Sequence, residues 1–131
     1  MIPTRDQLVQ IAGPGADLAN VDSVLFALEE FGAEHGLDKP HRLAHFIAQL
    51  AHESGGFRYD REVWGPTPAQ QRYDTRTDLG NTPEVDGDGK KNAGKGPMQL
   101  TGAANIAQFE QWCIDRGYDP PDFSADPDLI N

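Results

Sequence analysis

Hydrophobic residues recur at the spacing of an α-helix in four stretches of the chain, and the first two lie in its opening third. Thr4 and Gln7 form a capping-box pattern, which predicts a short helix that ends at Gly13. The pattern predicts a second helix that begins at about residues 20–22 and ends at Gly36. The apolar residues expected to face inward are Leu8, Val9, Ile11, Val21, Val24, Leu25, Leu28 and Phe31.

A third helix is predicted to begin around residues 38–40, because proline is tolerated in the first turn of a helix. Its apolar stripe consists of Leu43, Phe46, Ile47 and Leu50. Gly55-Gly56 interrupts the pattern, so His52 and Glu53 fall at or just beyond the last helical turn. A side chain at such a position can be held rigidly beside an open cleft.

The helical pattern fades between residues 58 and 96 and returns at about residues 103–116. Repeated Gly-Pro, Thr-Pro and Asp-Gly pairs in the intervening segment are typical of turns. We expect a long, partly ordered loop there that lines a groove, with room for a short strand or hairpin. The fourth helix presents Ile106, Phe109 and Cys113 on one face and stops at Gly117. The pattern therefore predicts a mostly α fold in a single domain, residues 1–131.

Composition and charge restrict the classes of function. Hydrophobic residues make up 37% of the 131 residues, enough for a modest core, and the 14 Gly and 10 Pro agree with a loop-rich chain. The formal net charge is −10, and the eleven Lys and Arg form no basic stripe, so we expect no nucleic-acid partner.

The cysteine content and the hydropathy profile bear on where the protein is made. Cys113 stands alone, which rules out an intramolecular disulfide and favours synthesis in a reducing compartment. The first residues lack the apolar stretch of a signal peptide, and no segment approaches the roughly 20 apolar residues of a membrane span. We therefore expect a monomer made in the cytoplasm without a signal peptide and without membrane insertion.

Glu53 and Glu62, nine residues apart, are the candidate catalytic pair. Glycosidic cleavage requires one carboxyl group that stays protonated and one that stays ionised. We expect packed helix atoms to favour the neutral form of Glu53, and a loop position to keep Glu62 charged. The spacing is compatible with both a retaining and an inverting geometry. The alternative is that Glu53 caps a helix or pairs with Arg, and that Glu62 is one of many exposed acids.

Three motifs in order resemble those of glycoside hydrolase family 19, which holds plant-type chitinases and many phage endolysins. Residues 52–57 are HESGGF, residues 78–82 are DLGNT and residues 94–102 are GKGPMQLTG. The resemblance covers roughly residues 38–131. It implies a lysozyme-like helical domain that hydrolyses β-1,4 bonds in peptidoglycan or a chitin-type polysaccharide, with no metal and no organic cofactor.

The resemblance also implies roles for individual residues. Glu53 matches the general acid, and Glu62 matches the general base of an inverting reaction in the endolysin branch. Thr101 matches a hydroxyl residue that helps to hold the water, although it could also cap the following helix. The implied substrate-binding residues are Gln99 and Asn105. His52, which directly precedes the acid, is interpreted as a structural support for it rather than as a base. Apart from the resemblance, Tyr59, Trp64 and Tyr73 are candidates for stacking on sugar rings, or alternatively for pinning the loop to the core.

The chain departs from the family pattern at several positions. Lys95 stands where the family often has Arg, and Lys lacks the planar fork that binds a carboxylate through two bonds. Ile106 replaces a tyrosine, and the later helices that complete the family's cleft have no counterpart in the 131 residues. The resemblance thus implies a reduced version of the fold.

The favoured hypothesis is a peptidoglycan-degrading endolysin that reaches the bacterial cell wall after release, either through a holin-opened membrane or as a phage or effector component. The nine-residue spacing of Glu53 and Glu62, shorter than in plant chitinases, favours this over a chitinase. A third hypothesis is a remnant that binds glycans without cleaving them. His41 and His45 are four residues apart and are interpreted as a solvent-facing pair, because no third metal ligand accompanies them.

Overall fold

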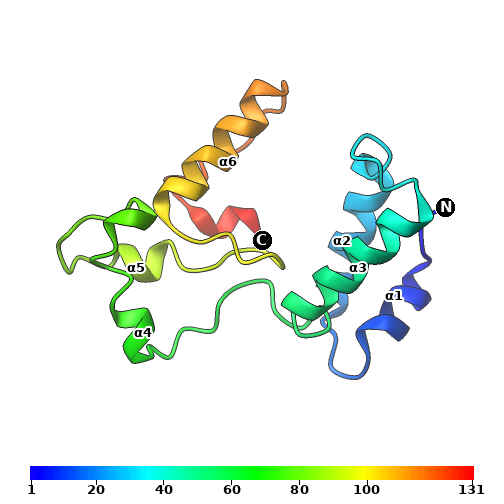
Figure 1. Cartoon of the computed structure of the whole chain (residues 1–131), viewed down its shortest axis with the longest axis horizontal. Coiled ribbons are helices and arrows are strands. Elements are labelled where there is room, and N and C mark those ends of the chain that lie inside the picture. The colour runs from blue at the N-terminus through cyan, green and yellow to red at the C-terminus, as the bar shows by residue number, and fades with distance from the viewer. The chain divides into compact units, whose positions relative to one another are not determined.

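The computed structural model describes all 131 residues and confirms the mostly helical fold, with no named strand. The chain forms two compact units, residues 1–60 and residues 61–131 (Figure 1). None of the helices has both the length and the apolar character that crossing a membrane requires.

The first unit is built from three helices around one core. They are α1 (Arg5–Ala12), α2 (Leu18–Phe31) and α3 (Pro40–Glu53), the blue to green elements of Figure 1. Each helix turns one apolar face inward, as the helical spacing predicts, but Ile11 and Phe31, predicted to face inward, are 52% and 39% exposed. The buried residues of this core are Leu8, Val21, Val24, Leu28, Leu43, Ile47, Leu50 and Phe57.

Capping side chains determine where α1 and α2 begin. The predicted capping box is confirmed at α1, where the Gln7 amide donates to the Thr4 hydroxyl oxygen and the Thr4 amide donates to the Gln7 side chain. The predicted start of α2 at residues 20–22 is wrong, because Asp17 caps the helix by accepting a hydrogen bond from the Ala19 amide at 2.8 Å. The helix also ends at Phe31, before the predicted Gly36.

A tight turn follows α3 and brings Phe57, which the helical pattern does not include, into the core. Phe46, expected on the inner stripe, is 36% exposed, whereas Phe57 is fully buried. The Ser54 hydroxyl donates to the Leu50 carbonyl at 2.7 Å and accepts from the Phe57 amide at 2.8 Å. Phe57 has a positive φ of 55°, an unusual conformation for a residue other than glycine, and Gly55 and Gly56 also have positive φ. The turn thereby folds the chain back and inserts Phe57 into the core.

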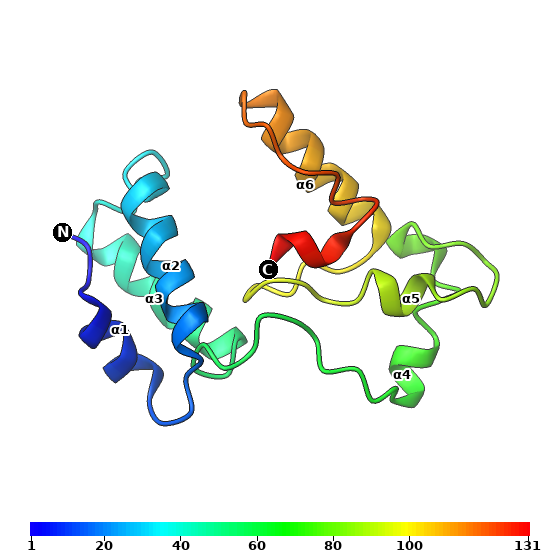
Figure 2. The same cartoon turned by 180° about the vertical axis from the view of Figure 1, so that it is seen from behind.

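The second unit contains short helices where the sequence predicts a loop. They are α4 (Pro68–Gln71), the 3-10 helix η1 (Thr77–Leu79) and α5 (Asp88–Lys91), and their arrangement can be followed from both sides in Figures 1 and 2. Lys95 forms isolated β-bridges to Arg61 and to Leu100, but these do not extend into a strand. The predicted loop is therefore a series of turns and single helical turns.

The helix α6 (Ala103–Asp115) supplies the apolar side of the second unit, and the 3-10 helix η2 (Pro127–Ile130) closes the chain. Ile106 and Cys113 are buried, as predicted. Phe109 stacks on Phe123, with their ring centroids 5.6 Å apart. The C-terminal segment thus packs against the helix face that the sequence pattern identifies.

Candidate functional site

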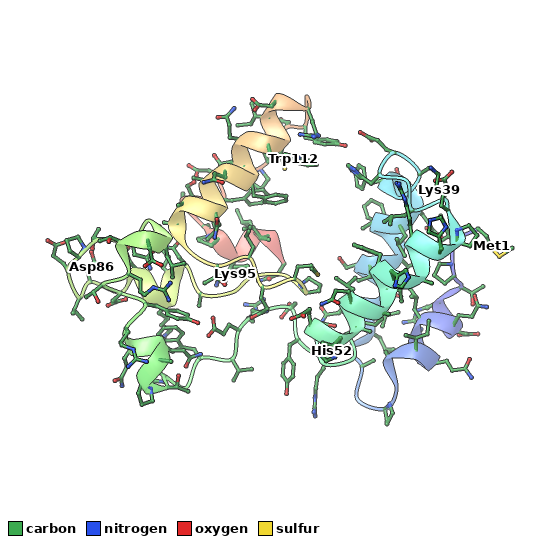
Figure 3. The ribbon with its side chains drawn as sticks, in the orientation of Figure 1. Met1, Lys39, His52, Asp86, Lys95 and Trp112 are labelled. Atoms are coloured by element: carbon green, nitrogen blue, oxygen red, sulfur yellow. The ribbon has the colours of Figure 1, made fainter.

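The candidate acid, Glu53, is the last residue of α3, and its side chain is exposed. The Gln49 side-chain amide, one helical turn earlier, donates to Glu53 Oε1 at 2.7 Å. His52, labelled in Figure 3, is exposed beside it. The expected desolvation of Glu53 by packed helix atoms is not observed, because a carboxyl group at this helix end projects beyond the core.

The backbone after Glu53 is anchored to the start of α2. The Phe57 carbonyl accepts hydrogen bonds from the Asp17 amide and from the Asn20 side chain, both at 3.2 Å. Tyr59 is 43% exposed, and its ring lies so close to Gly55 that a Cβ there would be 3.2 Å from a ring carbon. Tyr59 is thus a partly exposed aromatic residue next to the end of α3, with the Arg58 guanidinium 5.7 Å from its ring centroid.

Glu62, the candidate base, is half-buried and held on both carboxylate oxygens. Oε2 accepts from the Gly94 amide at 3.1 Å, and Oε1 accepts from the Gln70 side-chain amide at 2.9 Å. The Glu62 amide in turn donates to the Gly94 carbonyl at 2.7 Å. Donors on both oxygens stabilise a negatively charged carboxylate and fix its orientation.

One aromatic residue, Tyr73, borders the Glu62 carboxylate, and a second, Trp64, packs against Tyr73. Burial raises the pKa of the Tyr73 hydroxyl, and the negative charge of Glu62 and a hydrogen bond to it raise that pKa further. The Trp64 ring is tilted against the Tyr73 ring, with centroids 6.1 Å apart. Tyr73 therefore joins the tryptophan and the carboxylate into one cluster.

Gly94 is the point at which three predicted site residues meet. Besides its two hydrogen bonds with Glu62, Gly94 lies against the side chains of Gln99 and Thr101. A Cβ at this position would be 2.5 Å from Gln99 Oε1 and 3.3 Å from Thr101 Oγ1. Only glycine leaves room for this convergence.

The segment from Gln99 to Asn105 is shaped by its own hydrogen bonds. Gln99 has a positive φ of 58°, and the Thr101 hydroxyl donates to its carbonyl at 2.9 Å. The interpretation of Thr101 as a helix cap is wrong, because Gly102 occupies the N-cap of α6 without a side-chain cap. Asn105 is exposed, and its side-chain amide donates to the Thr101 carbonyl at 2.7 Å. The Thr101 hydroxyl and the Asn105 amide thus both bond to backbone carbonyls of this segment and hold its turn.

A pocket of about 480 Å³ in the second unit is lined by Glu62 and Trp64. Lys95, labelled in Figure 3, lies in its wall and is only 8% exposed. Its ammonium group donates to Asp128 Oδ1 at 2.6 Å, and Arg61 is 3.9 Å from the same oxygen. The hydrogen bond from Lys95, with the two positive charges, holds the pKa of Asp128 below its ordinary value. Lys95 thus binds a carboxylate through one hydrogen bond, without the planar fork that an arginine would offer.

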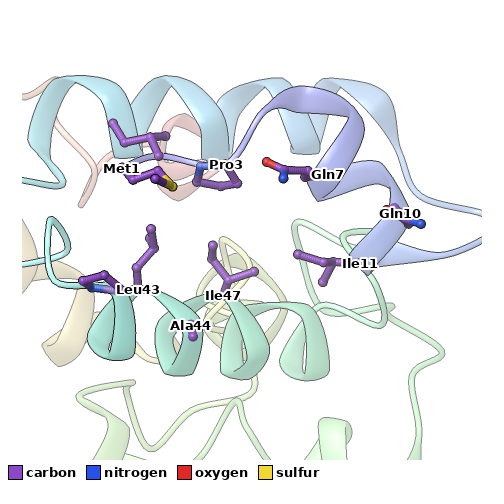
Figure 4. Close-up of a pocket in the computed structure, with 10 residues that line it drawn as sticks. Met1, Pro3, Gln7, Gln10, Ile11, Leu43, Ala44 and Ile47 are labelled. Carbon is purple, nitrogen blue, oxygen red and sulfur yellow. The ribbon is translucent and has the colours of Figure 1, made fainter.

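A second pocket, of about 400 Å³, lies in the first unit between α3 and the N-terminal segment with α1. Figure 4 shows Met1, Pro3 and Ile11 on one side of it and Leu43 and Ile47 on the other. Its lining carries no charged side chain and none of the predicted site residues. The chemistry of the site therefore lies elsewhere.

The predicted site residues fall into two groups. His52, Glu53 and Tyr59 belong to the first unit, and the other five belong to the second. In the second unit, Glu62, Gln99 and Thr101 meet around Gly94, while Trp64 lines the pocket and Asn105 contacts the Thr101 backbone. Each group contains one of the two candidate carboxylates together with polar and aromatic side chains.

Sequence reasoning missed Gln70, Gly94 and the contact of Tyr73 with Glu62. Gln70 carries a local signal, because it stands three residues after Thr67 and completes a capping box there. Its side chain is buried, and its Oε1 accepts from the Gly65 and Thr67 amides while its amide donates to Glu62. The capping-box pattern therefore marks a residue that also holds the candidate base.

Comparison with known proteins provides independent information about function. The chain is 32% identical to a glycosyl hydrolase family 19 domain-containing protein of Haemophilus influenzae, across 66% of the chain and 55% of that protein. It therefore spans about half the length of this relative. No family model matches the chain. No solved structure matches it either. The sequence is thus similar to a protein with a glycosyl hydrolase family 19 domain.

Proposed function

We propose that the chain belongs to glycoside hydrolase family 19 and hydrolyses β-1,4 glycosidic bonds of peptidoglycan as an endolysin. The observation that carries the proposal is the contrast between two carboxyl groups in a chain similar to a protein of that family. Glu62 is held by donors on both oxygens, whereas Glu53 stands exposed at a helix end. Acid and base catalysis at a glycosidic bond requires two carboxyl groups in unlike surroundings.

Glu62 serves as the general base in this proposal. Its donors, Gln70, Gly94 and Tyr73, stabilise the charged carboxylate that must accept a proton from water. The Thr101 hydroxyl, beside Gly94, accepts a hydrogen bond from the same water and orients it. The water then attacks the anomeric carbon in a single displacement that inverts its configuration.

Glu53 serves as the general acid and protonates the leaving oxygen. In the protein without bound glycan, the exposed Glu53 side chain is hydrated. A bound glycan displaces that water, and desolvation then favours the protonated form that the reaction needs. The Gln49 amide holds Glu53 Oε1, which leaves Oε2 to donate the proton.

The remaining polar and aromatic residues bind the sugar chain. The partly exposed ring of Tyr59 and the Trp64 ring in the pocket wall provide apolar surfaces for sugar rings. Gln99 and Asn105 provide amide groups for N-acetyl and hydroxyl groups, and His52 supports Glu53. The enzyme acts on the bacterial cell wall, where peptidoglycan is found.

The test is the release of soluble fragments from purified peptidoglycan and from chitin, with identification of the new reducing sugar. We expect release from peptidoglycan that Glu53→Gln abolishes and that Glu30→Gln, an exposed change on α2, leaves intact. Release from chitin alone would assign the chain to the chitinases. Binding without release from either polymer would instead identify a glycan-binding remnant.

A further inference from the structure

The pocket of the second unit concentrates positive charge in an acidic protein. Four of the eleven Lys and Arg of the chain line it, namely Arg61, Lys90, Lys91 and Lys95. Three acidic side chains share the lining, Glu62, Asp126 and Asp128. The pocket therefore carries a positive balance, although the formal charge of the whole chain is −10.

The charges in the pocket are unequally neutralised. Asp128 is paired with the buried Lys95 and lies near Arg61, and the Glu62 carboxylate is held by amide donors. Lys90 and Lys91 end the short helix α5, are exposed, and take part in no ion pair. These two ammonium groups are therefore the cations of the pocket that remain open to a ligand.

The two lysines share a pocket with the candidate base, Glu62. Lys90, Lys91 and Trp64 line the same 480 Å³ pocket as Glu62, so a ligand held in this pocket meets ammonium groups and an aromatic surface. The volume is sufficient for a few sugar or amino-acid residues. Chitin is uncharged and gives these lysines no partner, whereas the stem peptides of peptidoglycan carry carboxylates.

We propose that Lys90 and Lys91 bind a carboxylate of the peptidoglycan stem peptide while Trp64 packs against the adjoining sugar or peptide. This inference rests on the proposed function and specifies how the site distinguishes peptidoglycan from chitin. Two lysines at an open pocket attract a carboxylate through charge and hydrogen bonds, and the attraction weakens as salt increases.

The experiment measures binding by calorimetry to the full chain carrying Glu53→Gln, so that turnover does not consume the ligand. The ligands are a disaccharide tetrapeptide from peptidoglycan, the same compound with its carboxylates amidated, and neutral N-acetylchitotetraose. The test variant adds Lys90→Gln and Lys91→Gln. The matched control adds Lys39→Gln and Arg72→Gln, which removes the same charge at two exposed positions outside the pocket.

We expect the lysine pair change to weaken binding of the acidic muropeptide about ten-fold, as the loss of two partly exposed ion pairs implies. Amidation should weaken binding to the parent by a similar factor, and neither change should affect the chitotetraose. Equal affinity for the acidic and amidated muropeptides, no muropeptide binding at all, or an equal loss in the matched control would overturn the inference.

The proposed function has a separate readout, the release of fragments from peptidoglycan by the chain with Glu53 intact. Release together with charge-independent muropeptide binding means that the enzyme assignment stands and the lysine assignment fails. Charge-dependent binding without release means that the lysine site stands and the catalytic assignment fails.

Discussion

Glu62 is bonded to the backbone of Gly94 twice, once through its carboxylate and once through its own backbone amide. The Gly94 amide donates to Glu62 Oε2 at 3.1 Å, and the Glu62 amide donates to the Gly94 carbonyl at 2.7 Å. Two bonds between the same residues restrict the backbone and the side chain together. The candidate base is therefore positioned by a glycine 32 residues away in the sequence.

Gly94→Ala should disturb the site because the new Cβ would stand 2.5 Å from Gln99 Oε1. We expect a loss of about 1–3 kcal/mol in the free energy of unfolding, as for other overpacked positions. Fragment release should fall further than the folded fraction does, since Gln99 and Thr101 must move. Urea unfolding and release from peptidoglycan measure the two effects.

Gly117→Ala is the control for this change. Its Cβ would meet nothing within 4 Å, and only its positive φ of 80° opposes a side chain. The expected cost is about 1 kcal/mol, with no effect on release by the folded protein. Equal losses of release in the two folded variants would contradict the role of Gly94.

Gln70→Glu should weaken the second support of the candidate base. The Gln70 amide donates to Glu62 Oε1 and to the Val63 carbonyl, and a carboxylate at this position would face both acceptors without a donor. We expect a loss of about 1–3 kcal/mol in the free energy of unfolding, measured by urea titration at neutral pH. Gln71→Glu makes the same chemical change at the exposed neighbouring residue and should be nearly neutral. A similar loss in both variants would mean that the bond to Glu62 contributes nothing.

The alkaline limb of the stability profile should depend on Tyr73. Burial and the neighbouring Glu62 charge raise its pKa, so the folded chain keeps the hydroxyl proton at a pH where the unfolded chain releases it. The stabilising contribution of Tyr73 to the free energy of unfolding is complete below the pKa of about 10 in the unfolded chain. It is lost as the pH rises through the raised pKa of the folded chain. Urea unfolding across this range should show that the free energy of unfolding declines as the pH rises, and that Tyr73→Phe makes this decline smaller. Tyr59→Phe, which keeps Tyr73, should retain the decline, and identical profiles for all three proteins would disprove the assignment.

The acid limb should depend on Asp128. Its pKa is lowered by the hydrogen bond from Lys95, with support from the charges of Lys95 and Arg61. The stabilising contribution of Asp128 to the free energy of unfolding is present above the pKa of about 3.9 in the unfolded chain. It is lost as the pH falls through the lower pKa of the folded chain. Asp128→Asn should therefore be less stable than the parent at neutral pH, and the difference should shrink towards strong acid. Thermal unfolding over this range measures it, with the exposed Asp119→Asn as control. A constant difference at every pH would contradict the ion pair.

The features that the sequence predicted correctly are local ones. The capping box of Thr4 and Gln7 and the inward positions of Leu43, Ile47 and Leu50 depend on residues within a few positions of each other. The predicted start of α2 at residues 20–22 was wrong because Asp17, which comes earlier in the chain, caps the helix. Local competition of this kind is decided by backbone geometry, which a pattern of residue types does not contain.

The surroundings of the two carboxyl groups could not be predicted in the same way. The exposure of Glu53 depends on how far a helix end projects from its core, and the support of Glu62 depends on the distant Gly94 and on the buried Gln70. The motif of residues 94–102 indicates that the segment matters, but the convergence on Gly94 exists only in the folded unit. Contacts between polar side chains that are far apart in the sequence are therefore visible only in the folded structure.

The most direct test of the central claim compares initial rates of fragment release from peptidoglycan by the parent, Glu53→Gln, Glu62→Gln and Glu30→Gln. Loss of the acid or of the base should lower the rate of release per folded molecule by about a hundred-fold or more, with the folded fraction of each variant measured by urea unfolding. Glu30→Gln should match the parent. Release that persists at the parental rate in both Glu53→Gln and Glu62→Gln would contradict the account.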